Sequence, residues 1–262
     1  MRTSSRRSGP GASKRSKVSE PRPAVTSPSA YSSEGELRTA EVQWILPGQL
    51  DTAIASWFGR YPAGMESRED AYLLHPVLRG LSVKIRAGRL LEVKKYEGSL
   101  GILDAAGRAR GRIEAWRKWS FPLGALGPGD AGPPLWAVVH KRRWISQFLR
   151  HGGGLTTEIP IPADRPERAG ESVCAVELTE VRSGGETWWS LGFEATGPVD
   201  LLRAMLQDTA ALIFAHAPPG DVKLDLSHCQ SYAEWLSRRR IPGETGIPAS
   251  AKAVSNDEGP VA

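Results

Sequence analysis

Charged residues recur at every second position in several short apolar runs of this 262-residue chain. The basic runs come first and the acidic runs last, as in Val83-Lys84-Ile85-Arg86 and Val176-Glu177-Leu178-Thr179. Residues i and i+2 of a β-strand point to the same face of a sheet, so each run predicts one charged and one mostly apolar face. If the charged faces converge, they enclose cations and carboxylates together, which suits a polyanion and a divalent metal ion.

Six basic residues in these runs are candidates to bind a polyanion. They are Lys84, Arg86, Lys94, Lys118, Lys141 and Arg143. Arg suits paired contacts to phosphate oxygens, and Lys acts as a point charge. Unpaired cations gathered on one surface repel one another strongly at low effective dielectric, and Glu92 is a candidate ion-pair partner that relieves this repulsion.

Three acidic residues are candidates to hold Mg²⁺ or Mn²⁺, because these ions prefer oxygen ligands. They are Glu41, Glu177 and Glu194. A metal ion held there would bridge phosphate oxygens and orient a water molecule for attack on the terminal phosphorus. Lys94 and Glu194 are the candidate catalytic residues in this scheme, and most of their work is positioning and charge stabilisation.

The elements that position these residues are mostly short strands bounded by turns. The predicted strands are Ala40–Leu46, Ala71–Leu74, Leu81–Arg86, Leu90–Tyr96, Ile113–Phe121, Trp136–Ser146, Val173–Arg182 and Thr187–Thr196. The predicted helices are Leu50–Phe58, Val199–His216 and Tyr232–Arg238. Two loops are expected, one over Gly124–Pro134 and a long polar one over residues 151–170. Some eight strands with few helices predict a mainly β (α+β) fold, either an antiparallel barrel or a strongly curved sheet.

Composition divides the chain into three parts. Residues 1–36 are rich in Ser, Arg, Pro and Gly and carry most of the net charge of +5, so they predict a disordered basic tail. Such a tail can contact nucleic acid, although a solubilising role is the expected one. Residues 37–240 form the expected folded domain, and residues 241–262 form a second flexible tail.

Sequence features also bound the cellular setting. No apolar run approaches the ~20 residues that span a bilayer, and no apolar stretch follows the N-terminal basic residues, so we expect neither a membrane span nor a secretory signal. Cys174 and Cys229 lack CxxC spacing and fit a reduced compartment, as buried thiols. These features predict a cytoplasmic protein.

The order of these elements and charges resembles the CYTH superfamily, also called triphosphate tunnel enzymes, over residues 37–240. The similar segments are a strand ending in a basic pair, the next strand with an inward lysine, a K-x-R strand and two late acidic strands: Leu81–Arg86, Leu91–Lys94, Val139–Arg143, Val176–Thr179 and Gly192–Glu194. The resemblance implies an eight-stranded antiparallel sheet closed into a tunnel, with a few flanking helices. It also implies a small-molecule polyanion, a triphosphate, as the ligand.

One segment departs from the pattern of that superfamily. The family signature is an N-terminal E-x-E-x-K strand, and the corresponding segment here is Glu41-Val42-Gln43-Trp44-Ile45. An amide replaces the second glutamate and an apolar residue replaces the lysine. Because a neutral amide coordinates a hard cation more weakly than a carboxylate does, the resemblance is to a divergent member with a degenerate first motif.

The sequence supports three hypotheses about function. The first is divalent-metal-dependent hydrolysis of tripolyphosphate or an organic triphosphate inside a basic tunnel. The second is a non-catalytic module of the same fold that binds a phosphorylated ligand or nucleic acid. The third is an unrelated β-barrel whose charged faces meet solvent. Metal dependence separates the first two, because a simple polyanion binder loses affinity mainly with added salt.

Overall fold

The structure is a computed structural model that describes residues 36–61, 63–75, 78, 80–123, 136–150, 156–159 and 172–239. The two predicted tails lie outside these residues, apart from Glu36 at the end of the first. The predicted loop Gly124–Pro134 and most of the predicted loop 151–170 also lie outside them.

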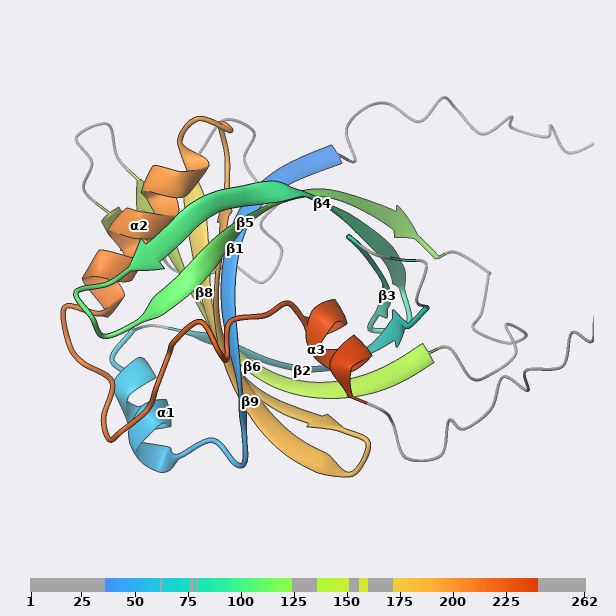
Figure 1. Cartoon of the computed structure of the whole chain (residues 1–262), viewed down its shortest axis with the longest axis horizontal. Coiled ribbons are helices and arrows are strands. Elements are labelled where there is room, and N and C mark those ends of the chain that lie inside the picture. The colour runs from blue at the N-terminus through green and yellow to red at the C-terminus, as the bar shows by residue number, and fades with distance from the viewer. Residues whose placement is uncertain are drawn as a thin grey trace, which may run out of the picture. The chain divides into compact units, whose positions relative to one another are not determined.

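The strands of the described residues form one antiparallel sheet (Figure 1). They are β1 (Glu36–Pro47), β2 (Gly64–Leu73), β3 (Leu81–Arg86), β4 (Leu90–Asp104), β5 (Arg110–Pro122), β6 (Trp136–Arg150), β7 (Thr156–Ile159), β8 (Val173–Ser183) and β9 (Glu186–Thr196). Neighbours follow the order β2-β3-β4-β5-β1-β9-β8-β6, and β6 pairs back with β2, so these eight strands close into a barrel. β7 pairs with the last residues of β6. The predicted eight-stranded antiparallel barrel is confirmed.

Alternation along each strand decides which side chains face the interior of the barrel. In β1, Val42 and Trp44 point outward into the main hydrophobic core, whereas Glu41 and Gln43 line the interior. Gly111 of β5 permits this outward packing, because a Cβ there would lie 2.5 Å from Val42 and 2.7 Å from Trp44. The indole Nε1 of Trp44 also donates a hydrogen bond to the backbone oxygen next to Gly111, at 3.1 Å.

Two helices pack on the outer face of the sheet. Helix α1 (Thr52–Phe58) begins at Asp51, whose carboxylate accepts a hydrogen bond from the backbone of Ala53 at 2.7 Å. Helix α2 (Leu202–Ile213) packs its apolar stripe against β1, β8 and β9. With 12 residues, α2 is the longest described helix, and since a bilayer takes about 20 apolar residues, none of the described helices can span a membrane.

Helix α3 (Tyr232–Arg238) lies within the ring of strands in Figure 1. The pairing of β1 with β5 ends at Glu41, and the segment before α3 takes the place of β5 along the rest of β1. There the backbone N–H of Ile45 donates a hydrogen bond to the backbone oxygen of His228, and the backbone N–H of Gln230 donates one to that of Gln43, both at 3.0 Å. Helix α3 then completes a second apolar cluster inside the barrel. Its buried members are Ile45, Tyr72, Ala137, Val139, Val181, Tyr232, Trp235 and Leu236. This cluster fills one part of the barrel and leaves the rest to charged side chains.

Several boundaries differ from those predicted. β2 begins at Gly64, whereas the predicted strand began at Ala71. The prediction started late because the first half of β2 is so charged that its sequence resembles a loop. β7 falls inside the predicted loop 151–170. The prediction of buried free thiols at Cys174 and Cys229 is confirmed.

Candidate functional site

A cavity of about 130 Å³ lies inside the barrel beside the start of α3. This is space for several water molecules or a small anionic group. Its charged lining residues come from seven strands. They are Glu41, Arg68, Lys84, Glu92, Lys94, Lys141, Arg143, Glu177 and Glu194.

All nine predicted site residues are ion-paired within this interior. Seven of them line the cavity itself, and the remaining two, Arg86 and Lys118, pair with lining carboxylates, Arg86 with Glu92 at 3.3 Å and Lys118 with Glu194 at 3.8 Å. Ion pairs shorter than 4 Å divide the interior charges into two groups, which we call the Lys94 cluster and the Asp70 network.

The Lys94 cluster comprises Lys94, Lys118, Glu41 and Glu194. Nζ of Lys94 lies 2.5 Å from Oε1 of Glu41 and 3.5 Å from Oε1 of Glu194. Burial by itself lowers the pKa of Lys94, but Glu194 and Glu41 outweigh it and raise that pKa above its ordinary value. Burial raises the pKa of Glu194, but Lys94 and Lys118 hold it well below its usual range. Lys94 and Glu194 are therefore charged at neutral pH.

The Asp70 network centres on a carboxylate that is fully buried. Asp70 lies 3.1 Å from Nζ of Lys141, 3.1 Å from Nε of Arg68 and 3.8 Å from Nζ of Lys84. Through shared partners the network extends to further residues. These are Glu66, Arg86, Glu92, Arg143 and Glu177. Glu92, predicted from the sequence as an internal ion-pair partner, pairs with both Lys84 and Arg86.

Burial and pairing act in opposite directions on the pKa values of this network. Burial raises the pKa of Asp70, but Lys141 and Lys84 bring it down to about 2. Burial likewise raises the pKa of Glu92, and Lys84 and Lys118 lower it to about 2. For Lys84, burial dominates and lowers the pKa to about 8, with Glu92 and Asp70 offsetting only part of the cost. The network thus keeps Asp70 and Glu92 ionised, while burial lowers the pKa of Lys84.

Two of the predicted site residues, Glu177 and Lys141, are held by close contacts with other side chains of the protein. Glu177 forms an ion pair with Arg143 and accepts a hydrogen bond from Thr179 at 2.5 Å. Lys141 lies beneath α3, with its Nζ 2.8 Å from the hydroxyl of Tyr72 and 3.5 Å from the centre of the Tyr232 ring. Its side chain is only 2% exposed, so a ligand reaches it only if these contacts open.

The predicted basic tunnel needs a correction. Across the two groups, seven basic side chains meet six carboxylates, so the interior is nearly neutral. Residues Glu66, Arg68 and Asp70 of β2, which lie outside the predicted strands, add two carboxylates and one guanidinium to the interior and lower its net charge by one. Their spacing at every second position, continued by Tyr72, is the signal that identifies them, but the intervening Glu69 hides it.

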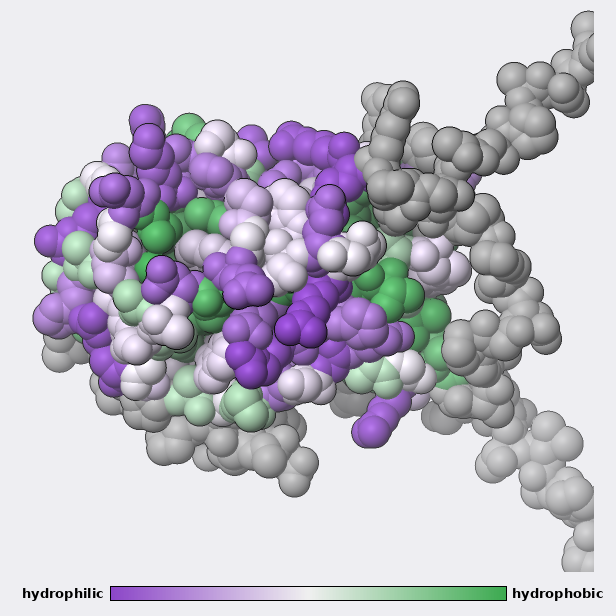
Figure 2. All heavy atoms as spheres, turned by 90° about the horizontal axis from the view of Figure 1, so that it is seen from below, coloured by the Kyte–Doolittle hydropathy of each residue, from purple (hydrophilic) through white to green (hydrophobic). Residues whose placement is uncertain are grey.

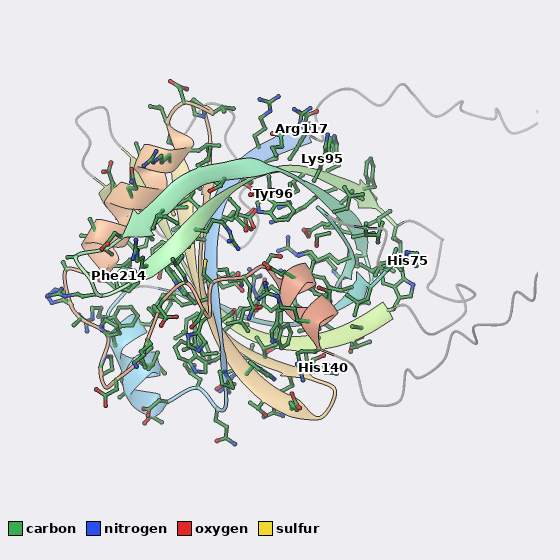
Figure 3. The ribbon with its side chains drawn as sticks, in the orientation of Figure 1. His75, Lys95, Tyr96, Arg117, His140 and Phe214 are labelled. Carbon is green, nitrogen blue, oxygen red and sulfur yellow. The ribbon has the colours of Figure 1, made fainter. Side chains whose placement is uncertain are left out.

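The structure decides which face of β6 points inward. Lys141 and Arg143 are buried, whereas His140 and Arg142 are exposed on the outer wall. Figure 3 shows His140 below the barrel, pointing away from its interior, and also places Lys95 and Arg117 outside the opposite wall, with Tyr96 inside. The described surface seen from below is mixed, with hydrophilic residues across its centre and hydrophobic residues toward both sides (Figure 2).

Comparison with known proteins adds little to this description. No protein-family model and no curated protein matches the chain. Among solved structures, the chain is similar to the S. pombe Pct1 RNA triphosphatase in complex with the Spt5 CTD, with 10% sequence identity and a TM-score of 0.34, over 70% of this chain and 82% of that one. Because identity and TM-score are both low, we infer nothing about this chain from that protein.

A first prediction concerns the stability of the Asp70 network. Asp70→Asn keeps the shape of the side chain but leaves Arg68, Lys84 and Lys141 without their shared counter-charge, which should lower the free energy of unfolding by about 3–5 kcal/mol. Glu180→Gln is the matched control, because Glu180 pairs with the exposed Arg142 at 2.7 Å and should cost less than about 1 kcal/mol. Urea denaturation at pH 7 measures both, and equal effects of the two variants would contradict the account.

A second prediction concerns acid unfolding. The pKa of Glu92 falls from its ordinary value of 4.5 to about 2, so the stability it contributes is complete above pH 4.5 and is lost as the pH falls towards 2. This contribution is about 3 kcal/mol. Urea midpoints measured from pH 6 to pH 2 should therefore fall less steeply for Glu92→Gln than for the wild type. Parallel curves would show that Glu92 is not paired in the folded protein.

Proposed function

We propose that the tunnel binds the triphosphate group of tripolyphosphate or an organic triphosphate and hydrolyses it with the help of a divalent cation, as a divergent CYTH-like protein. The observation that carries this proposal is the convergence of nine charged residues, predicted from alternation and from the resemblance to the CYTH superfamily, inside one closed barrel. A solvent-facing barrel with the same strands would place these charges on its outer wall.

The oxygen donors present fit Mg²⁺ or Mn²⁺, on the condition that the ligand supplies further oxygens. Glu41 and Glu194 stand directly opposite each other on β1 and β9, and the Gln43 amide lies two residues along. In the described part of the chain, no three acidic, His or Cys side chains form a metal-binding group. Mg²⁺ is commonly held by one or two carboxylates plus substrate phosphates, and this arrangement matches that donor set. When bound, the cation would neutralise phosphate charge and polarise the terminal phosphorus.

In this proposal, the side chains of the tunnel bind the phosphate groups and stabilise their charge. Lys94 and Lys118 are the most exposed lysines of the interior, at 15% and 14% of their side chains, and in our proposal they bind phosphate oxygens. Arg86 and Lys84 extend that contact along β3, while Arg143 and Lys141 bind only if their present partners release them. Lys94 stabilises charge on the reacting phosphate, and Glu194 is the carboxylate that holds the cation. Catalysis then consists mostly of positioning and charge compensation.

A second candidate function is a non-catalytic module that binds a phosphorylated ligand. Two observations favour it. The interior is nearly neutral, and Ile45 stands where the family's lysine belongs, packed with α3 in the apolar cluster. Such a module binds its ligand by charge and therefore responds to salt more than to a chelator. A role for nucleic acid contact by the predicted basic tail concerns residues outside the described part of the chain.

A third prediction tests the enzymatic proposal through phosphate release from tripolyphosphate with Mg²⁺, with Mn²⁺ and with chelator. Lys94→Ala and Glu194→Ala should each reduce release by about 100-fold or more, a typical cost of removing one charge-stabilising group. Lys95→Ala is the matched control, because Lys95 is the next residue but lies on the outer wall (Figure 3), and it should retain wild-type release. Well-folded protein that releases no phosphate under any condition would rule out a tripolyphosphatase.

A further inference from the structure

The Lys94 cluster places like charges opposite each other on two pairs of strands. Glu41 of β1 is the direct cross-strand partner of Glu194 on β9, and Lys94 of β4 is the direct partner of Lys118 on β5. Like charges in such positions destabilise a sheet. They are tolerated here because the ammonium of Lys94 lies between the two carboxylates, at 2.5 Å and 3.5 Å, and Lys118 lies 3.8 Å from Glu194.

Each half of the cluster therefore fills a site that an external ion would otherwise occupy. The Lys94 ammonium sits where a cation between Glu41 and Glu194 would sit. The Glu194 carboxylate sits where an anion between Lys94 and Lys118 would sit. Thr39 adds a hydrogen bond to Glu41 at 2.6 Å, which holds this carboxylate in place. The cluster is neutral as a whole, with two positive and two negative groups.

A single external ion meets resistance from this arrangement. A triphosphate alone has to draw Lys94 away from Glu41 and Glu194, which leaves the partly buried Glu41 without its counter-charge and leaves Glu194 with Lys118 alone. A divalent cation alone has to displace Lys94, which leaves a buried ammonium without a counter-charge. When both bind together, every charge keeps a partner of opposite sign.

We infer that the polyanion and the divalent cation bind this tunnel cooperatively, by exchanging partners with the Lys94 cluster. The cation replaces Lys94 beside Glu41 and Glu194, and phosphate oxygens replace the carboxylates beside Lys94 and Lys118. This inference rests on the proposed function of the tunnel, but it concerns the coupling of two binding events and is independent of whether hydrolysis follows. Linkage requires each ligand to raise the affinity for the other by the same factor.

Partner exchange has a consequence that sets it apart from simple metal coordination. In the absence of metal, Glu194 competes with the polyanion for Lys94 and Lys118. Glu194→Gln removes this competitor while keeping the size of the side chain. The variant should therefore bind the polyanion more tightly than the wild type in chelator, and it should gain less from added metal.

The test is calorimetric titration of the full chain with tripolyphosphate at fixed ionic strength, in chelator and in excess Mg²⁺. For the wild type, Mg²⁺ should raise the affinity about tenfold or more, within the range usual for coupled sites. Glu194→Gln should bind about fivefold more tightly than the wild type in chelator, and its enhancement by Mg²⁺ should fall below about threefold. Glu97→Gln is the matched control, because Glu97 pairs with Arg117 on the outer wall at 2.7 Å, and it should behave as the wild type.

The possible results separate this inference from the proposed function. Tight binding in chelator that Mg²⁺ does not improve would overturn the coupling but retain a polyanion site. Enhancement by Mg²⁺ without tighter metal-free binding of Glu194→Gln would overturn partner exchange in particular. No binding of tripolyphosphate by folded wild-type protein in either condition would overturn the proposed function, and the inference with it.

Discussion

The structure depends on pairing every charge that the barrel encloses. A closed sheet removes its inward side chains from bulk water, where an unpaired ion is costly, so an inward lysine is stable only beside a carboxylate. Asp70 illustrates the constraint most clearly: it is fully buried, and three cations from β2, β3 and β6 surround it. The Lys94 cluster satisfies the same constraint with two ions of each sign.

This constraint accounts for the division of the interior. Where the strands present apolar residues inward, α3 enters the barrel and packs on Ile45, Val139 and Val181. Where they present charges, a cavity remains beside the ion pairs. Lys141 belongs to both regions, since it pairs with Asp70 and lies against the ring of Tyr232. Helix α3 and the Asp70 network therefore stabilise each other.

Much of the fold was predictable because it depends on local patterns. Alternation predicted that Lys84 and Arg86 of β3 share one face of their strand, and the same pattern marked the strands β8 and β9. The ion-pair partners were harder to predict because they depend on how strands are staggered around the barrel. Lys94 and Glu41 form an ion pair although 53 residues separate them in the sequence, and a local sequence pattern does not reveal such a distant partner. The first part of β2, from Gly64 to Asp70, was missed for a related reason, since Asp70 looks like a loop residue until its partners are known.

The same pairing shapes the proposed function, because a neutral interior favours a ligand that brings charges of both signs. The most direct measurement is a crystal structure of the protein with Mn²⁺ and tripolyphosphate, in which the anomalous signal locates the metal. Our account predicts Mn²⁺ bound by Glu41 and Glu194, with the Lys94 ammonium turned to a phosphate oxygen. Tripolyphosphate bound outside the barrel, or an unchanged contact of Lys94 with Glu41 beside a bound ligand, would contradict it.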